Sequence, residues 1–403
     1  MSQGVAIASS ALRLDARPAS GVASAPREQS VGYFQRTTPV ALILGAFVVF
    51  TLPLTYLALT DADSQLLLKL ELAYMLGLGV THFVITPTIY LQSSNLRYFN
   101  SSLRNRLVYF AIPVAIFIVF DLYRALEIAV LLPLFDVAFR LTIRAVDFQH
   151  FSRQSFGVLQ LFKARAGVKF PAWQRRAEYW YAWATVAVLL VTYVRGGRLD
   201  TTVHPGLVAA HWLLAAILAG LGLTILAGIV VTARSAERPG RLLAPACYFL
   251  LQTTSALLAA YSTALYGIAL AMHYVEYHVL MLPRCFNTPL DPRRWTDRLF
   301  AALRHNRVIF YALLLMAAFG VSLLTGVTTS MVNAMAAMLA GMWKGYGGGA
   351  GPASSYTALV AIFDGLFVFH YFVEMFVWRF SEPHYRQTLS PLYFAAKPQA
   401  AQG

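Results

Sequence analysis

Residues 206–232 have the sequence GLVAAHWLLAAILAGLGLTILAGIVVT and contain no Asp, Glu, Lys or Arg. A helix needs about 20 apolar residues to cross the roughly 30 Å of hydrocarbon in a bilayer, so this stretch is long enough to span a membrane. It lacks the alternation of apolar and polar positions that a strand of a membrane β-barrel requires. The stretch therefore predicts a transmembrane helix.

Similar apolar stretches occupy most of the chain from Pro39 onward. Because a backbone in lipid must satisfy its own hydrogen bonds, each stretch is predicted to be helical. The expected fold is an all-α, polytopic integral membrane helical bundle. We predict ten spans, at 39–60, 66–91, 107–123, 125–151, 176–194, 206–232, 242–258, 260–282, 308–327 and 356–379.

Three regions follow from this pattern. Residues 1–38 are rich in Ala, Ser and Arg and are expected to form a disordered cytoplasmic tail. Residues 39–380 form the transmembrane helical domain, and residues 381–403 form a second cytoplasmic tail. The whole composition supports this division: 58% of residues are hydrophobic, only 12% are charged, and the mean hydropathy is +0.58. Since soluble domains carry about 25% charged residues, the composition excludes a soluble enzyme.

The net charge of +14 is explained by topology. With the N-terminus inside, 26 of the 32 Lys and Arg residues fall on the cytoplasmic side, where short basic loops stay. This predicts a bacterial inner-membrane protein with both termini in the cytoplasm. Anionic lipid headgroups are the natural partners of the basic face, and no nucleic-acid partner is expected.

Three histidines inside predicted spans share one depth. His82, His273 and His370 each lie nine residues before the predicted cytoplasmic end of their span. At 1.5 Å per residue, this position is roughly 13 Å inside the membrane boundary. Ionisable groups within a membrane are costly, so a set at equal depth indicates a function.

A fourth histidine, His150, lies at the cytoplasmic end of the span 125–151. All four helices run inward, so the imidazoles would converge if these helices surround one cavity. Glu276 follows His273 by three residues and Glu374 follows His370 by four, which puts each pair on one helix face. The glutamates would either ligate a second metal ion or hold the imidazoles as hydrogen-bond acceptors. Imidazole and carboxylate without thiolate favour non-haem iron, as one or two ions.

Two other functions use the same residues. A proton-coupled transporter would relay protons through Glu71, His82, Asp136, Glu276, Asp364 and Glu374. A haem-binding electron carrier would ligate its haem with two histidines. ATP-driven transport and hydrolysis are disfavoured, because the chain has no Gly-Lys-Ser/Thr, Gly-x-Ser-x-Gly or His-Glu-x-x-His motif.

Short motifs around the histidines resemble a known family. Gly79-Val-Thr-His82, Gln149-His150-Phe151 leading to Phe156-Gly157, and His273 with His278 are similar to the Brp/Blh-type β-carotene dioxygenases. That resemblance implies a polytopic membrane protein in which a few histidines hold one iron that cleaves a carotenoid with O₂. It makes His82, His150 and His273 the ligands, with His278 as a further candidate.

The function predicted from the sequence is an O₂-dependent oxidation of an apolar, lipid-dissolved substrate such as a carotenoid, an isoprenoid or a long alkyl chain. His82, His150, His273 and His370 would hold the metal, and His278 is a further candidate from the resemblance. Glu276 and Glu374 would act beside it. The sequence does not identify an electron donor.

Overall fold

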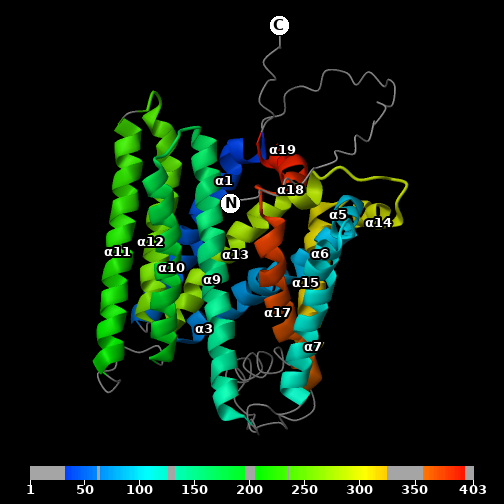
Figure 1. The fold of residues 1–403 in the computed structure, drawn as a ribbon, viewed down its shortest axis with the longest axis horizontal. Helices are drawn as coiled ribbons and strands as arrows, with labels where there is room; N and C mark the ends of the chain where they lie inside the picture. Colours follow the sequence, from blue (N-terminus) through cyan, green and yellow to red (C-terminus); the bar gives the residue numbers. More distant parts are fainter. Residues whose placement is uncertain are drawn as a thin grey trace, which may run out of the picture. The chain divides into compact units, whose positions relative to one another are not determined.

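The computed structural model describes residues 32–60, 64–125, 132–195, 205–234, 236–324 and 357–394. Every element in these residues is a helix, which confirms the all-α prediction (Figure 1). Most of the two predicted tails, residues 1–31 and 395–403, and the side chains of Glu71 and Asp364 lie outside the described residues.

The first half of the chain forms both regular and irregular helices. These are η1 (Tyr33–Gln35), α1 (Thr37–Ala46), η2 (Phe47–Thr51), α2 (Leu52–Thr60), α3 (Ser64–Tyr74), η3 (Met75–Val80), α4 (Thr81–Ile85), η4 (Thr86–Leu91), α5 (Ser93–Phe99), α6 (Leu103–Arg106), η5 (Leu107–Ala111), α7 (Ile112–Ala125), α9 (Pro133–Ala166) and α10 (Ala172–Val194).

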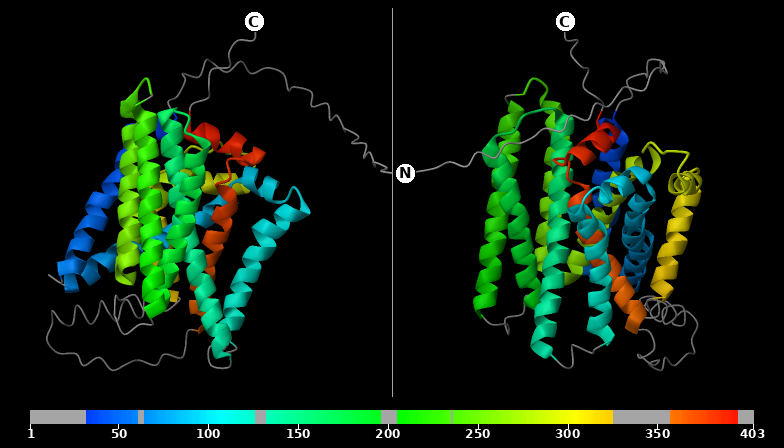
Figure 2. Two further views of the ribbon diagram at one scale, coloured as in Figure 1. Left: turned by 60° about the vertical axis from the view of Figure 1, so that its left-hand side comes forward. Right: turned by 45° about the vertical axis from the view of Figure 1, so that its right-hand side comes forward.

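The second half is dominated by longer helices. These are α11 (Pro205–Arg234), η6 (Pro239–Leu242), α12 (Leu243–Tyr261), α13 (Thr263–Phe286), α14 (Trp295–Leu303), α15 (Arg307–Leu324), α17 (Thr357–Val377), α18 (Pro383–Thr388) and α19 (Ser390–Tyr393). In Figures 1 and 2, α10, α11 and α12 run alongside one another, and all three pairs are in contact.

The ten predicted spans are supported in part. Among the described residues, four helices are long and apolar enough to cross a membrane: Thr37–Thr60, Leu103–Phe120, Pro205–Arg234 and Pro239–Tyr261. The pair Trp295–Leu303 and Arg307–Val321 makes a fifth if its two arms, bent by 100°, count as one span. Several other predicted spans carry polar side chains, such as His273, Glu276 and His278 on α13, and these lower their mean hydropathy.

Large apolar side chains on the apolar helices point outward. Leu223 on α11 is 69% exposed, and Val308 on α15 is 77% exposed. Proteins surrounded by water seldom expose broad apolar faces, so these surfaces are suited to lipid.

Helix α9 differs from its predicted boundaries. It begins at Pro133 and continues for 34 residues to Ala166, whereas the sequence predicted a span at 125–151. No proline interrupts residues 152–166, and the helix ends only where Gly167 adopts a left-handed conformation with φ of 70°. At about 1.5 Å per residue, α9 is roughly 50 Å long, well beyond the hydrocarbon thickness.

The predicted span 66–91 is broken into four helical segments. The π-helical η3 precedes His82, and the 3₁₀-helical η4 follows it. Such departures from α-helical geometry often mark functional positions. Gly79 lets η3 approach α13, because a Cβ atom at this position would lie 2.9 Å from the Tyr274 ring.

The four helices that carry the predicted site residues pack together. Both α9 and α4 contact α13 and α17. Part of the expected C-terminal tail also packs against the domain, since Tyr385 in α18 and Tyr393 in α19 are fully buried. Tyr385 donates a hydrogen bond to the Tyr109 hydroxyl at 2.9 Å.

Candidate metal centre

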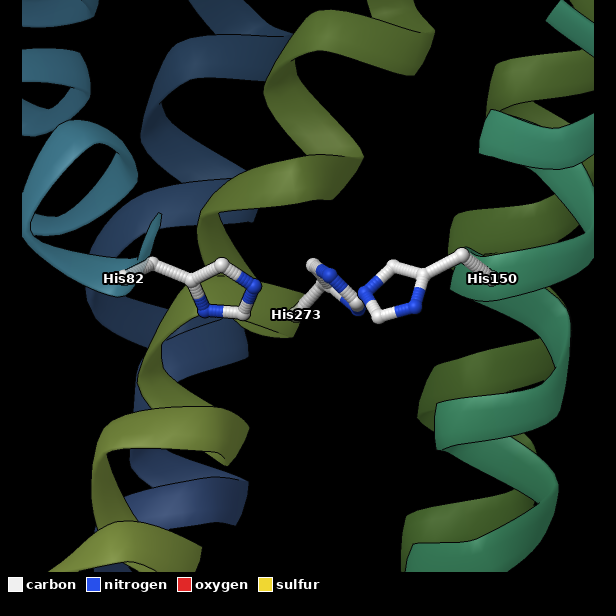
Figure 3. A group of neighbouring side chains, drawn as sticks. All are labelled: His82, His150 and His273. Carbon is white, nitrogen blue, oxygen red and sulfur yellow. The ribbon is translucent and has the colours of Figure 1, made fainter. Parts of the chain in front are cut away.

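Four buried histidines meet between α4, α9, α13 and α17. His82, His150, His273 and His370 are each at most 5% exposed. The centroid of the His82 ring lies 4.3 Å from that of His370 and 5.0 Å from that of His273. Figure 3 shows His82, His150 and His273 pointing toward one another from three different helices.

The side chains form two groups that could hold a metal ion. His82, His150 and His273 make one group, and His150, His370 and Glu374 make the other. Within each group the candidate ligand atoms lie within 4.8 Å of one another. Bonds of about 2.1 Å at tetrahedral angles place two ligand atoms of one ion about 3.4 Å apart, so a contraction of up to about 1.4 Å would close either group.

The donor atoms of this cluster are free to bind. The Nδ1 and Nε2 atoms of His82, Nε2 of His150, Nδ1 of His273 and Nε2 of His370 have no hydrogen-bond partner in the described residues. Buried polar atoms in native proteins nearly always have hydrogen-bond partners. A buried nitrogen left without one destabilises the folded state by about 1–3 kcal/mol. The residues therefore fit a metal ion.

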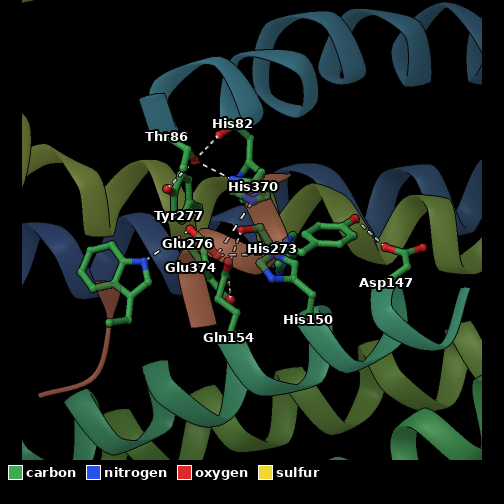
Figure 4. Close-up of polar contacts among 12 residues, drawn as sticks. His82, Thr86, Asp147, His150, Gln154, His273, Glu276, Tyr277, His370 and Glu374 are labelled. Atoms are coloured by element: carbon green, nitrogen blue, oxygen red, sulfur yellow. Dashed lines mark hydrogen bonds and ion pairs between the residues drawn. The ribbon is translucent and has the colours of Figure 1, made fainter. Parts of the chain in front are cut away.

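A polar residue follows each of the four histidines by four positions. These residues are Thr86, Gln154, Tyr277 and Glu374, and helical geometry puts each on the same face as its histidine. Each contacts a group from another helix (Figure 4). Glu374 Oε2, for example, lies 3.5 Å from Nε2 of His150 and 3.8 Å from Nε2 of His370.

Thr86 connects three of the helices. Its hydroxyl lies 2.5 Å from Nδ1 of His370 and 2.7 Å from the Tyr277 hydroxyl. With Nδ1 of His370 occupied in this way, Nε2 faces the centre. Hydrogen bonds of this kind fix the orientation of a ligating imidazole.

His150 is held by a different set of groups. Its ring stacks on Tyr371, with 4.0 Å between the centroids. The Tyr371 hydroxyl donates to Oδ1 of Asp147 at 2.7 Å, and Arg144 lies 3.4 Å from Oδ2 of the same carboxylate. Tyr371 of α17 thus links the His150 ring to Asp147 and Arg144, which lie one and about two turns earlier on α9.

Glu374 also has a partner just beyond the end of its own helix. Trp378 Nε1 donates to Oε1 of Glu374 at 3.3 Å, which leaves Oε2 directed at the histidines. The guanidinium of the fully buried Arg284 lies 5.4 Å from the centroid of the Trp378 ring. A positive charge therefore lies next to the tryptophan that donates to Glu374.

Two of the predicted residues lie outside both ligand groups. Glu276 accepts hydrogen bonds from Tyr248 at 2.8 Å and Gln154 at 3.2 Å. His278 turns its Nε2 toward Thr81 and the carbonyl of Leu78, each at 3.1 Å. Asp136, part of the alternative relay, pairs with Arg140 at 2.7 Å near the start of α9.

The sequence interpretation missed the supporting residues Thr86, Tyr277, Tyr371 and Trp378. Three of these four share a signal that the sequence does contain, because each lies four residues after a member of the cluster. Tyr371 has no such signal, since it follows His370 directly and acts on His150 from another helix.

A cavity of about 280 Å³ lies beside the cluster. Its walls include Phe148, Tyr193 and Tyr266 from α9, α10 and α13. The Tyr266 ring lies 5.7 Å from Phe151, which in turn lies 5.7 Å from His273. Two aromatic rings, Tyr266 and Phe151, thus lie between the cavity and His273.

Comparison with protein-family models, with curated proteins and with solved structures gives no match for this chain. The resemblance to the β-carotene dioxygenases therefore stays a prediction, and the function has to be inferred from the site itself.

Proposed function

We propose that this chain is an integral membrane oxygenase that holds non-haem iron and oxidises an apolar, lipid-dissolved substrate with O₂. The iron would be bound by His150, His370 and Glu374 together with His82 and His273. Two histidines and one carboxylate are the ligand set of many non-haem iron oxygenases, and the group formed by His150, His370 and Glu374 has this composition. That group is the observation that carries the proposal.

One ion per chain is the favoured content. The two ligand groups share His150, and a neutral imidazole offers one nitrogen to one metal ion. Two ions would have to compete for this residue. A single ion can instead draw ligands from both groups.

The protein has three tasks in this function. Thr86, Tyr371 and Trp378 orient His370, His150 and Glu374 respectively. The aromatic layer around the site, which includes Phe83 and Tyr274, keeps water away from it. Iron would supply the reaction with O₂, which amino-acid side chains cannot activate by themselves.

The substrate would come from the lipid phase. The cavity beside Tyr266 is lined mainly by aromatic and aliphatic side chains, with Arg144 and Thr192 among its polar members, and two aromatic rings separate it from His273. Such a wall suits part of a carotenoid, an isoprenoid or an alkyl chain. Outward-facing apolar side chains, such as Leu223, support a membrane location. We further propose that the polar helices also cross the bilayer, giving ten spans with both termini in the cytoplasm.

Metal analysis of the purified protein tests this proposal. Protein from iron-replete cells should contain about one iron per chain and show no Soret band. His370→Ala should lose most of the iron, because it removes one ligand of the central group. His278→Ala is the matched control, since His278 is also buried in the membrane domain but belongs to neither ligand group.

Other results would redirect the proposal. Iron retained in full by His370→Ala would show that His370 is not a ligand and that the group formed by His150, His370 and Glu374 does not hold the ion. Absence of any metal from the wild-type protein would favour the proton-coupled transporter, and a Soret band would favour the haem carrier.

A further inference from the structure

A second, smaller cavity lies between α9, α10 and α12. It measures about 20 Å³, and its wall combines apolar side chains such as Phe156, Leu159 and Phe249 with polar groups from all three helices, among them Ser152, Ser155, Glu178, Tyr181, Tyr248 and Gln252. A cavity needs about 10–15 Å³ by this measure to hold a water molecule. The small cavity therefore has room for one.

Two hydroxyl groups in its wall have no hydrogen-bond partner in the described residues. They are Ser152 Oγ and Ser155 Oγ, on side chains that are 4% and 3% exposed. A buried hydroxyl without a partner is unfavourable by about 1–3 kcal/mol, whereas an internal water usually makes two to four hydrogen bonds. Size and chemistry thus both match bound water.

One end of the cavity is charged. Glu178 accepts two hydrogen bonds from Lys163, at 2.7 and 2.9 Å, and both side chains are buried. Gln160 donates to the same carboxylate at 2.9 Å. Because α9 ends at Ala166 and α10 begins at Ala172, this pair lies near the turn that joins the two helices.

The other end leads toward the histidines. The Tyr248 hydroxyl donates to Oε1 of Glu276 at 2.8 Å. Gln154 donates to Oε2 of Glu276 at 3.2 Å and to the carbonyl of His273 at 2.8 Å (Figure 4). Glu276 is thus joined to the cavity on one side and to the ligand-bearing helix face on the other.

We propose that this cavity holds ordered water and that the water, together with Tyr248, forms a proton path between Glu178 and Glu276. Water and a tyrosine hydroxyl each donate and accept a hydrogen bond, which proton transfer along a chain requires. The path explains why Glu276 lies beside the cluster and not in it: the carboxyl group exchanges protons and leaves ligation to Glu374. The inference does not depend on iron, since a proton path can be measured in metal-free protein.

Hydrogen–deuterium exchange at the Glu276 carboxyl group tests the path. The full chain in detergent is transferred to D₂O at acid pH, and the carboxyl stretch is followed by infrared spectroscopy. The band is assigned by its absence in Glu276→Gln. In Tyr248→Phe the exchange should slow at least about tenfold, because the relay loses its hydroxyl.

Tyr261→Phe is the matched control. Tyr261 is in the same helix as Tyr248 but is half exposed, so its removal should leave the exchange rate unchanged. If Tyr248→Phe does not fold, Ser155→Val serves in its place, because the larger side chain fills the cavity and should slow exchange to a similar degree.

An exchange rate in Tyr248→Phe equal to that of the wild type would overturn the proposal. So would a Glu276 carboxyl group that never takes up a proton between about pH 5 and pH 9, since it could not then end a proton path. Iron content measured on the same samples reports separately on the proposed function.

Discussion

Removing the Thr86 hydroxyl should lower the affinity of the proposed centre for iron without removing a ligand. Its hydroxyl contacts both His370 and Tyr277. We expect Thr86→Val, which keeps the shape of the side chain, to weaken iron binding about 10- to 100-fold, as loss of a group that orients a ligand commonly does. Titration of metal-free protein with Fe²⁺ measures the change.

Thr88→Val is the control for this substitution. Thr88 is also buried and two residues away, but its hydroxyl donates to the carbonyl of Ile85 and contacts no histidine. Iron affinity should be unchanged in Thr88→Val. Equal losses in both variants would mean that a general disturbance of η4 is responsible.

His384 should make stability depend on pH. It stacks on Tyr98 with 4.1 Å between the ring centroids. Burial, and after it the positive charge of Arg284, lowers the pKa of His384 from 6.5 to about 4. The folded state therefore favours the neutral ring, so the stability that His384 contributes is complete above about pH 6.5 and is lost as the pH falls toward 4.

The measurement is the unfolding temperature in detergent between pH 7 and pH 4, for the wild type and for His384→Phe. The wild type should lose more stability over this range, because the phenyl ring of the variant has no charge to gain. Parallel curves for the two proteins would contradict the expected role of His384.

Some features of the site could be predicted from the positions of residues in the sequence, and others could not. The shared depth of His82, His273 and His370 follows from a constant rise per residue, and the structure brings these histidines together with His150. The spacing of Thr86 from His82 is visible in the sequence, but its contact with His370 is not, because that contact depends on α17 lying beside η4. Glu276 was expected to act at the metal, but its partners, Tyr248 and Gln154, come from helices whose positions the sequence does not specify.

At the scale of helices, η3 controls how closely His82 approaches α13. A methyl group at position 79 would meet the Tyr274 ring at 2.9 Å, so η3 or the ring would have to move. We expect Gly79→Ala to destabilise the protein by about 1–3 kcal/mol, as overpacking commonly does, and to lower iron content. Thermal unfolding and metal analysis measure both effects.

Gly77→Ala is the control within the same irregular segment. A Cβ atom at position 77 has nothing within 4 Å. This variant should keep its iron and its stability. If Gly79→Ala behaves in the same way, the contact with Tyr274 does not position His82.

Helix boundaries were predictable where hydropathy alone sets them. The spans 206–232 and 39–60 correspond closely to Pro205–Arg234 and Thr37–Thr60. Helix α9 begins eight residues after the start of the predicted span 125–151 and continues 15 residues beyond its end, because the helical backbone continues after residue 151 while the hydropathy falls. The division of the predicted span 66–91 into different helix types could not be predicted from hydropathy. Residues 75–91 are mainly apolar, although the backbone changes from π-helix in η3 to 3₁₀-helix in η4.

For the whole molecule, the distribution of basic residues predicts the sidedness of each loop. Thr60, at the end of α2, and Ser102, just before α6, are both exposed and should lie on opposite sides of the membrane. In a Cys247→Ala background, a membrane-impermeant maleimide should label Ser102→Cys only in inside-out vesicles and Thr60→Cys only in right-side-out vesicles. The same side for both would refute the predicted topology.

The interlocking of the four helices also determines when the centre can form during synthesis. Thr86 and the His370 that it orients are separated by 284 residues, and Glu374 follows still later. A nascent chain that has inserted α4, α9 and α13 holds three of the histidines but lacks α17. The group formed by His150, His370 and Glu374 is therefore complete only after α17 has been made, so in the proposed function this group would take up its ion after that point.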